Sequence, residues 1–100
     1  MEFTKVKNNG VLTVAVRGHL DTNTAPVFES GLKGELSDIT ELRLDLTNLV
    51  YISSAGLRAL LTLHKAMAAK KGKLVLLHPD EEVMEILDMT GFSTFLNIEH

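Results

Sequence analysis

Two adjacent serines, Ser53 and Ser54, carry the most distinctive chemistry in this sequence. They lie within YISSAGLR, residues 51–58, where an apolar stretch gives way to a helical pattern. The first backbone N–H groups of a helix lack partners within it, and a serine oxygen placed there can accept from them. A phosphate on such a serine would meet the same N–H groups and the positive end of the helix dipole. The pair predicts either a simple helix cap or a cap beside a modifiable hydroxyl.

Capping is the ordinary role of a serine that precedes a helix, but one cap satisfies the need. The second hydroxyl is then left without a structural task. Ala55 and Gly56 also keep the first turn small, so a partner or a bulky group can approach the backbone.

Other patterns that would indicate catalysis are missing from the sequence. It contains no nucleophile elbow, phosphate-binding glycine loop or zinc-protease motif. The absence of cysteine excludes disulfides and thiolate metal sites. The histidines lack metal-ligand spacing, and the carboxylates at loop and strand ends are expected to form turns and caps. We therefore expect no catalytic residue, metal or cofactor; the residues weighed are His19, His64, His78, His100, Asp21, Asp38 and Asp45.

Length and composition limit the possibilities further. The 100 residues suit one domain spanning 1–100, and 45% hydrophobic with 23% charged residues is ordinary for a globular protein. The net charge is −3 with scattered basic residues, which gives no electrostatic footprint for nucleic acid. No apolar run approaches the ~18 residues of a membrane span, and the N-terminus lacks the apolar core of a signal peptide. We expect a soluble, cytoplasmic domain.

The elements that must position the serines alternate between strand-like and helix-like segments. Asn8-Asn9-Gly10 is typical of a hairpin turn, so the first two strands are expected to be antiparallel. The predicted order is β-β-α-β-α-β-α, an α/β domain with a mixed central sheet. The expected strands are Glu2–Lys7, Val11–Arg17, 42–52 and Lys73–His78; the expected helices are 25–36, 57–70 and 79–91, with a last helical turn and strand within 92–98.

Three segments together resemble a known family. RGHLDTNTA, LRLDLTNLVYISSAGLRALL and LDMTGFSTFL are similar, in this order and at this spacing, to segments of STAS domains, and more narrowly of bacterial anti-sigma factor antagonists. The central segment is quite specific, and the likeness covers nearly the whole chain. The resemblance implies a single STAS-like domain whose helices pack mainly on one face of the mixed sheet.

The resemblance also implies a binding module rather than an enzyme. In its unphosphorylated form it would bind an anti-sigma factor that is a serine kinase of the GHKL type, and so release a sigma factor. The kinase would phosphorylate one serine at the start of the second helix, and a PP2C-like phosphatase would reset the switch. Alternatives from the same resemblance are a STAS protein of another partner-switching pathway, controlling a stressosome or secretion, and an accessory subunit of a membrane transporter.

Site residues follow from the family motif, Asp-Ser-Ser/Thr-Gly-Leu, by position. Anchoring on Gly56-Leu57 places Ser54 at the phosphorylated position, with Ser53 where the motif has aspartate and Ala55 at the second hydroxyl residue. The missing aspartate makes Ser53 a secondary candidate for the phosphate. The expected partner-binding residues are Asp21, Ser53, Gly56 and Arg58.

Overall fold

A hairpin forms one edge of the sheet in the computed structural model, which describes residues 1–100. β1 (Glu2–Asn8) pairs antiparallel with β2 (Val11–Leu20), as the sequence predicted. The two-residue turn places Asn9 at φ 51° and Gly10 at φ 80°, the conformation that suits tight hairpins. β2 runs three residues past the predicted end at Arg17, because register shifts and Gly18 at φ 96° let it bend beside β3.

Four strands of the sheet run parallel. The strand order is β1-β2-β3-β4-β5, and β2 is followed by β3 (Glu41–Ile52), β4 (Lys73–Leu77) and β5 (Asn97–Glu99). The parallel connections contain α1 (Ala25–Lys33), α2 (Ser54–Ala69), and α3 (Glu81–Met89) followed by the short 3-10 helix η1 (Phe92–Thr94). This confirms the α/β class, the mixed sheet and the predicted element order, with β5 as the expected last strand.

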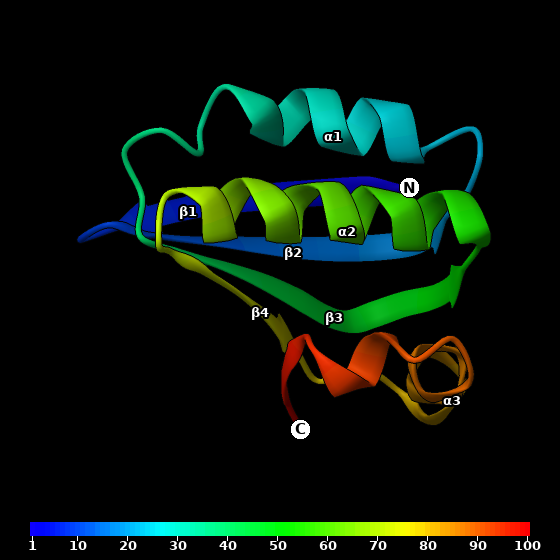
Figure 1. Ribbon diagram of the computed structural model, residues 1–100. Coiled ribbons are helices and arrows are strands. Elements are labelled where there is room, and N and C mark those ends of the chain that lie inside the picture. The colour runs from blue at the N-terminus through cyan, green and yellow to red at the C-terminus, as the bar shows by residue number, and fades with distance from the viewer.

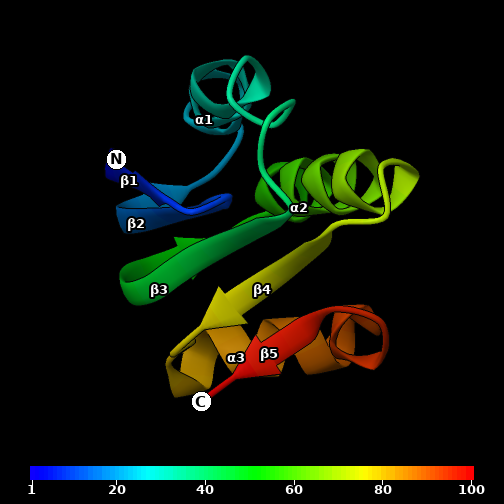
Figure 2. The ribbon, with the colours of Figure 1, turned by 90° about the vertical axis from the view of Figure 1, so that its left-hand side faces the viewer.

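The helices gather on one face of the sheet. Every parallel connection advances in the same direction across the sheet, and right-handed crossovers then place their helices on the same side. α1 and α2 lie alongside each other over β2 and β3, while α3 lies at the other edge of the sheet (Figures 1 and 2) and is seen nearly end-on in Figure 1. None of the helices is both long and apolar enough to cross a bilayer.

Successive side chains of a strand point to opposite faces of the sheet, and one of these faces forms the core. Leu42 and Leu44 pair in register with Leu74 and Leu76, and all four are buried in one cluster with residues of the three helices. Each such side chain contributes about 1.5–3 kcal/mol relative to an exposed one. On the other face of β3, Arg43 forms ion pairs with Glu41 and Glu99.

α1 is shorter than the sequence predicted, and the end of α2 has its own backbone geometry. α1 ends at Lys33 rather than continuing to Leu36, although Leu36 is still buried in the following turn. At the end of α2 the positive φ of 63° belongs to Lys71, not Gly72. Gly72 serves a close approach instead, since a Cβ there would lie 2.7 Å from the Thr40 carbonyl oxygen.

Candidate functional site

The two serines lie at the edge of the sheet where its parallel strands end. Leu20 and Ile52 are partners at the ends of β2 and β3. The Ser53 N–H donates to the Leu20 carbonyl at 2.9 Å. This bond brings the β2–α1 loop and the start of α2 together, although they are more than thirty residues apart in the sequence.

The two serines have different roles in the structure. Ser53 is the N-cap of α2, with extended backbone, and its hydroxyl oxygen accepts from the Gly56 N–H at 3.4 Å. Ser54 is the first residue of the helix and is exposed, and its hydroxyl takes part in none of the side-chain hydrogen bonds. The structure therefore contains the predicted cap and, beside it, an accessible hydroxyl that the fold does not use.

Gly56 holds α2 against the sheet. It is buried, and a Cβ there would lie 2.5 Å from the Leu20 carbonyl oxygen and 2.7 Å from the Ile52 side chain. Only glycine permits this approach, and the approach fixes where Ser53 and Ser54 stand. Gly56 thus shapes the candidate surface through the backbone.

Asp21 organises the neighbouring loop. Its carboxylate accepts from the backbone N–H groups of Asn23 at 2.9 Å and Thr24 at 3.1 Å. Partial burial alone would raise the pKa of Asp21, but these hydrogen bonds, that of the Thr24 hydroxyl and the nearby His19 together lower it. The carboxylate is consequently charged at neutral pH, and it orders its own loop at the same edge of the sheet as Ser53.

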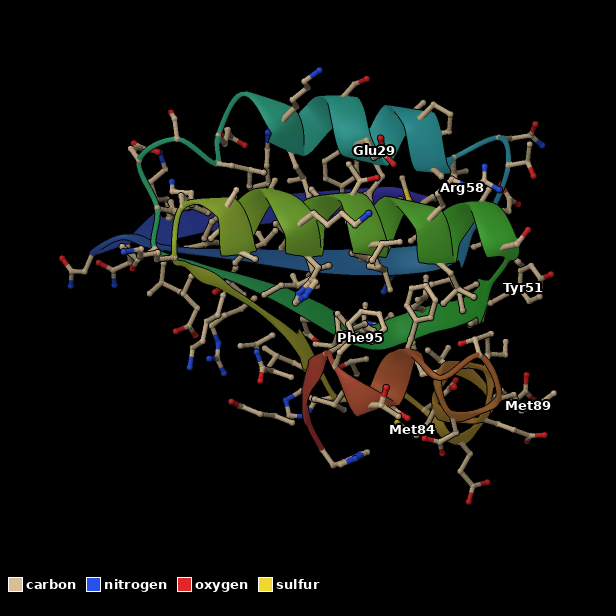
Figure 3. All side chains as sticks on the ribbon, in the orientation of Figure 1. Glu29, Tyr51, Arg58, Met84, Met89 and Phe95 are labelled. Carbon is tan, nitrogen blue, oxygen red and sulfur yellow. The ribbon has the colours of Figure 1, made fainter.

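Arg58 stands one turn after Ser54 on the wall of a shallow cleft. Its side chain is exposed and takes part in none of the ion pairs. Figure 3 shows the Arg58 side chain between the starts of α1 and α2, and Glu29 of α1 lies at the same space between the two helices. The cleft has a volume of about 260 Å³ and is lined by Thr22, Ala25, Pro26, Glu29, Ala55 and Arg58.

Two apolar side chains beside the serines were not among the predicted site residues. Val50 is 51% exposed and Tyr51 46% exposed. Tyr51 packs against His19 of β2, with ring centroids 6.0 Å apart. A signal was present in the sequence: Leu49, Val50, Tyr51 and Ile52 are consecutive, and alternation cannot bury all four.

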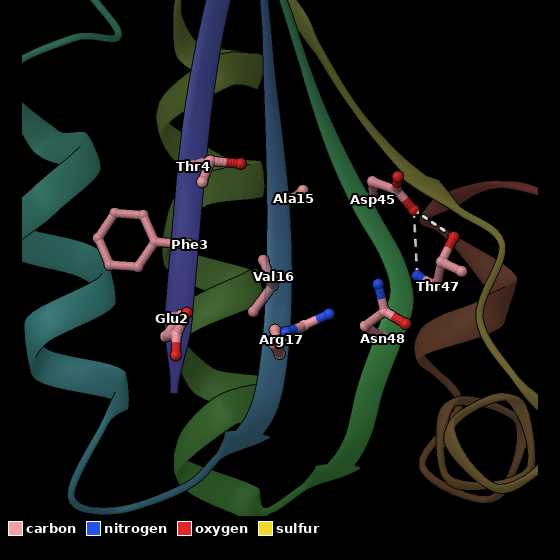
Figure 4. Close-up of a pocket in the computed structure, with 9 residues that line it drawn as sticks. All are labelled: Glu2, Phe3, Thr4, Ala15, Val16, Arg17, Asp45, Thr47 and Asn48. Atoms are coloured by element: carbon pink, nitrogen blue, oxygen red, sulfur yellow. Dashed lines mark hydrogen bonds between the residues drawn. The ribbon is translucent and has the colours of Figure 1, made fainter.

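A second hollow lies on the uncovered face of the sheet, over β1, β2 and β3 (Figure 4). Its volume is about 280 Å³, and Arg17 and Asp45 are among its lining residues. Asp45 accepts from the Thr47 hydroxyl at 2.6 Å and the Thr47 N–H at 3.0 Å, and these bonds lower its pKa. The sequence placed Asp45 at a strand end as a turn or cap residue, but it lies within β3, where its carboxylate is engaged beside the shift in register between β2 and β3.

The other residues considered for chemistry are scattered over the fold. Asp38 pairs with Lys7 at 2.8 Å, and His78 lies 3.0 Å from the His100 carbonyl oxygen through Nδ1. His64 is half-buried on α2, with its ring centroid 5.4 Å from that of Phe95, so its ring packs against a neighbouring aromatic side chain. No three histidine, aspartate or glutamate side chains are grouped so that they could hold a metal ion.

Comparison with known proteins agrees with this geometry. The family model for the STAS domain matches residues 2–100. BtrV of Bordetella bronchiseptica, named as a candidate anti-sigma factor antagonist, is 36% identical over 94 residues, covering 92% of this chain and 80% of BtrV.

Solved structures show the same fold. A candidate anti-sigma factor antagonist from Thermotoga maritima (tm1081) superposes with a TM-score of 0.92 at 20% identity, covering 98% of this chain and 86% of that one. Phosphorylated SpoIIAA of Bacillus gives 0.77 at 15% identity, covering 97% and 90%. The unphosphorylated anti-sigma factor antagonist SpoIIAA gives 0.79. With the sequence motif, the fold and the family match in agreement, the chain belongs to the STAS domain family.

Proposed function

We propose that this chain is an anti-sigma factor antagonist whose binding is switched by phosphorylation of Ser54. The observation that carries the proposal is the difference between the serines: Ser53 caps α2, whereas Ser54 is exposed and its hydroxyl takes part in none of the side-chain hydrogen bonds. Ser54 also occupies the position, two residues before Gly56, at which the family motif has its phosphorylated serine. The names of the relatives support the antagonist role.

The partner in this proposal is an anti-sigma factor that is also a serine kinase of the GHKL type. It would bring ATP, while this chain supplies the acceptor hydroxyl and a docking surface, acting as a binding protein and not an enzyme. A PP2C-like phosphatase would restore the free serine. SpoIIAA, which has the same fold, has been solved in both unphosphorylated and phosphorylated forms.

The local structure can accept a phosphate without unfolding. The N–H groups of Ser54 and Ala55 are in the first turn of α2, where no intrahelical acceptor exists, and the dipole there favours an anion. The effect of the phosphate would fall on the interface. Asp21, Tyr51 and Arg58 surround the acceptor in the proposed surface, and a dianion there would have to lose water as the partner docks.

Ser53 remains the secondary acceptor. Ser53 is half-buried and its hydroxyl oxygen accepts from the Gly56 N–H, so phosphorylation there would break the cap. It also stands where the family motif has aspartate, so the partner's contacts beside the acceptor would differ from those made to that motif. A partner-switching role in stressosome or secretion control is for that reason the second candidate function.

The direct experiment is phosphorylation by a cognate kinase with ATP, followed by site mapping with mass spectrometry. We expect phosphate on Ser54, none in Ser54→Ala, and reduced incorporation in Ser53→Ala. Ser30→Ala, at an exposed serine of α1, is the matched control and should match the wild type. Phosphate found only on Ser53 would overturn the assignment.

A further inference from the structure

Charge is divided unequally along the chain. Residues 79–100 contain six of the thirteen acidic residues and none of the ten basic ones. That segment therefore carries −6, while residues 1–78 carry +3. The net charge of the protein arises from α3 and the strand that follows it.

Most of these carboxylates have no partner. Among the acidic residues from Pro79 onward, only Glu99 is in an ion pair, with Arg43 at 2.9 Å. Asp80 caps α3 by accepting from the Val83 N–H at 2.8 Å. The remaining acidic residues lie on α3 and form no ion pair with a lysine or arginine: Glu81, Glu82, Glu85 and Asp88.

Their spacing places like charges next to one another. Glu85 has Glu81 one turn before it and Asp88 three residues after it, and such pairs destabilise a helix. The helix dipole favours acids in the first turn, but it disfavours Asp88 near the C-terminal end. A cation bound along this row would relieve the repulsion.

Apolar side chains are exposed among the carboxylates. Met89 is 77% exposed and Phe95 44% exposed, and Met84 is half-buried. Figure 3 shows Met84 and Met89 on either side of α3 and Phe95 beside η1. Met84 also lines a shallow depression of about 410 Å³ with Glu81, Glu85 and Asp88.

Phe95 is held in place by its neighbours. Its ring centroid lies 5.3 Å from that of Phe92 and 5.4 Å from that of His64, so η1 is fixed against α2. A fixed aromatic ring and exposed, flexible methionines on the same α3–η1 segment suit a surface that receives apolar side chains of a partner.

We infer that this surface, the α3 face (Glu81, Met84, Glu85, Asp88, Met89 and Phe95), docks a cationic amphipathic segment of a partner protein. The apolar side of that segment would cover Met89 and Phe95, and its lysines or arginines would meet the carboxylates. Charge complementarity excludes a two-fold pairing of this face with itself, because it would bring two acidic rows together. This surface is separate from Ser54, and its binding does not require phosphorylation.

The test uses the full chain and a defined probe, an 18-residue peptide of leucine and lysine patterned as an amphipathic helix. Titration followed by amide chemical shifts should perturb residues 81–96 first. Glu81→Gln/Glu85→Gln and Met89→Ala should each weaken binding about three- to tenfold, the range of ~0.6–1.4 kcal/mol. The same peptide with glutamate in place of lysine should not bind.

Two control variants test whether peptide binding depends on the α3 face or on acidic and exposed apolar side chains in general. Glu2→Gln removes an exposed carboxylate of β1, and Val27→Ala shortens a 60% exposed side chain of α1. Both should bind within about twofold of the wild type, and circular dichroism should be the same for all variants. Three outcomes would each overturn the proposal. Glu2→Gln could weaken peptide binding as much as the α3 variants do, or the peptide could change the chemical shifts of every acidic segment. The protein could also self-associate through α3 without peptide. Phosphorylated and free protein should bind the peptide alike, so the outcome is independent of the Ser54 switch.

Discussion

The Ser53 N–H donates to the Leu20 carbonyl at 2.9 Å, and a Cβ on Gly56 would lie 2.5 Å from the same oxygen. A single backbone carbonyl at the end of β2 thus orients both the cap and the first turn of α2. The position of Ser54 depends on this contact, since it lies between the two residues that meet Leu20.

Gly56→Ala should destabilise the protein substantially, because the added methyl would overlap the Leu20 carbonyl and the Ile52 side chain. We expect a loss of about 1–3 kcal/mol in the free energy of unfolding, measured in urea. Gly34→Ala is the control. Gly34 has φ −76° and open space around its Cβ position, so this change should raise stability by about 0.4–1 kcal/mol. Similar small effects at both glycines would contradict the close-approach role of Gly56.

Alanine variants of the serines should differ in stability. Ser53→Ala removes the oxygen that accepts from the Gly56 N–H, and the cost should be about 0.5–2 kcal/mol. The bond is long at 3.4 Å, which favours the lower half of that range. Ser54→Ala removes an exposed hydroxyl without partners and should change stability by less than about 0.5 kcal/mol. If Ser53→Ala and Ser54→Ala lowered the denaturant midpoint equally, Ser53 would not be the cap and Ser54 would not be the free hydroxyl.

The sequence predicted the fold well where periodicity and turn chemistry agree. Leu42 and Leu44 alternate with charged residues, and Asn9-Gly10 suits only a few turns, so strands and hairpin were recovered. The end of β3 was less predictable, because the exposure of Val50 and Tyr51 depends on a register shift between β2 and β3. The motif located the serines, but their separate roles depend on the hydrogen bond of Ser53, which is a tertiary arrangement.

The α3 carboxylates lead to a stability prediction. Glu85→Gln removes a charge that has acidic neighbours one turn away on both sides, so the free energy of unfolding should rise. We expect a gain of about 0.2–0.5 kcal/mol for each like-charge pair removed, decreasing at high salt. Glu2→Gln, on β1, should show no comparable gain. A loss of stability in Glu85→Gln at low salt would mean that the helix does not experience the repulsion.

Asp21 should contribute to acid sensitivity. Hydrogen bonds from Thr24 and Asn23 outweigh its burial and depress its folded-state pKa below the unfolded value of about 3.9. A depressed pKa adds stability above the unfolded pKa, and this stability is lost as pH falls through the folded pKa. Asp21→Asn should therefore make unfolding less dependent on pH below about 4. Carboxyl chemical shifts of Asp21 that titrate at or above pH 4 would contradict the depressed pKa.

Phosphorylation of Ser54 should weaken partner binding while the fold remains intact. The phosphate adds about 1.5–2 negative charges at the start of α2, where the dipole and the free N–H groups tolerate an anion. In the proposed interface the same group would be desolvated near Asp21, which is already charged. A penalty of ~2–4 kcal/mol corresponds to about 30- to 1000-fold weaker binding.

An aspartate at this position has one charge and fewer oxygens, so Ser54→Asp should weaken binding less than true phosphorylation. Calorimetry with the anti-sigma factor partner measures both affinities, and circular dichroism of the same samples reports on α2. Unchanged affinity after phosphorylation would contradict the switch. Lost affinity together with lost helix signal would show that the phosphate acts by unfolding α2, because a local electrostatic effect leaves the spectrum unchanged.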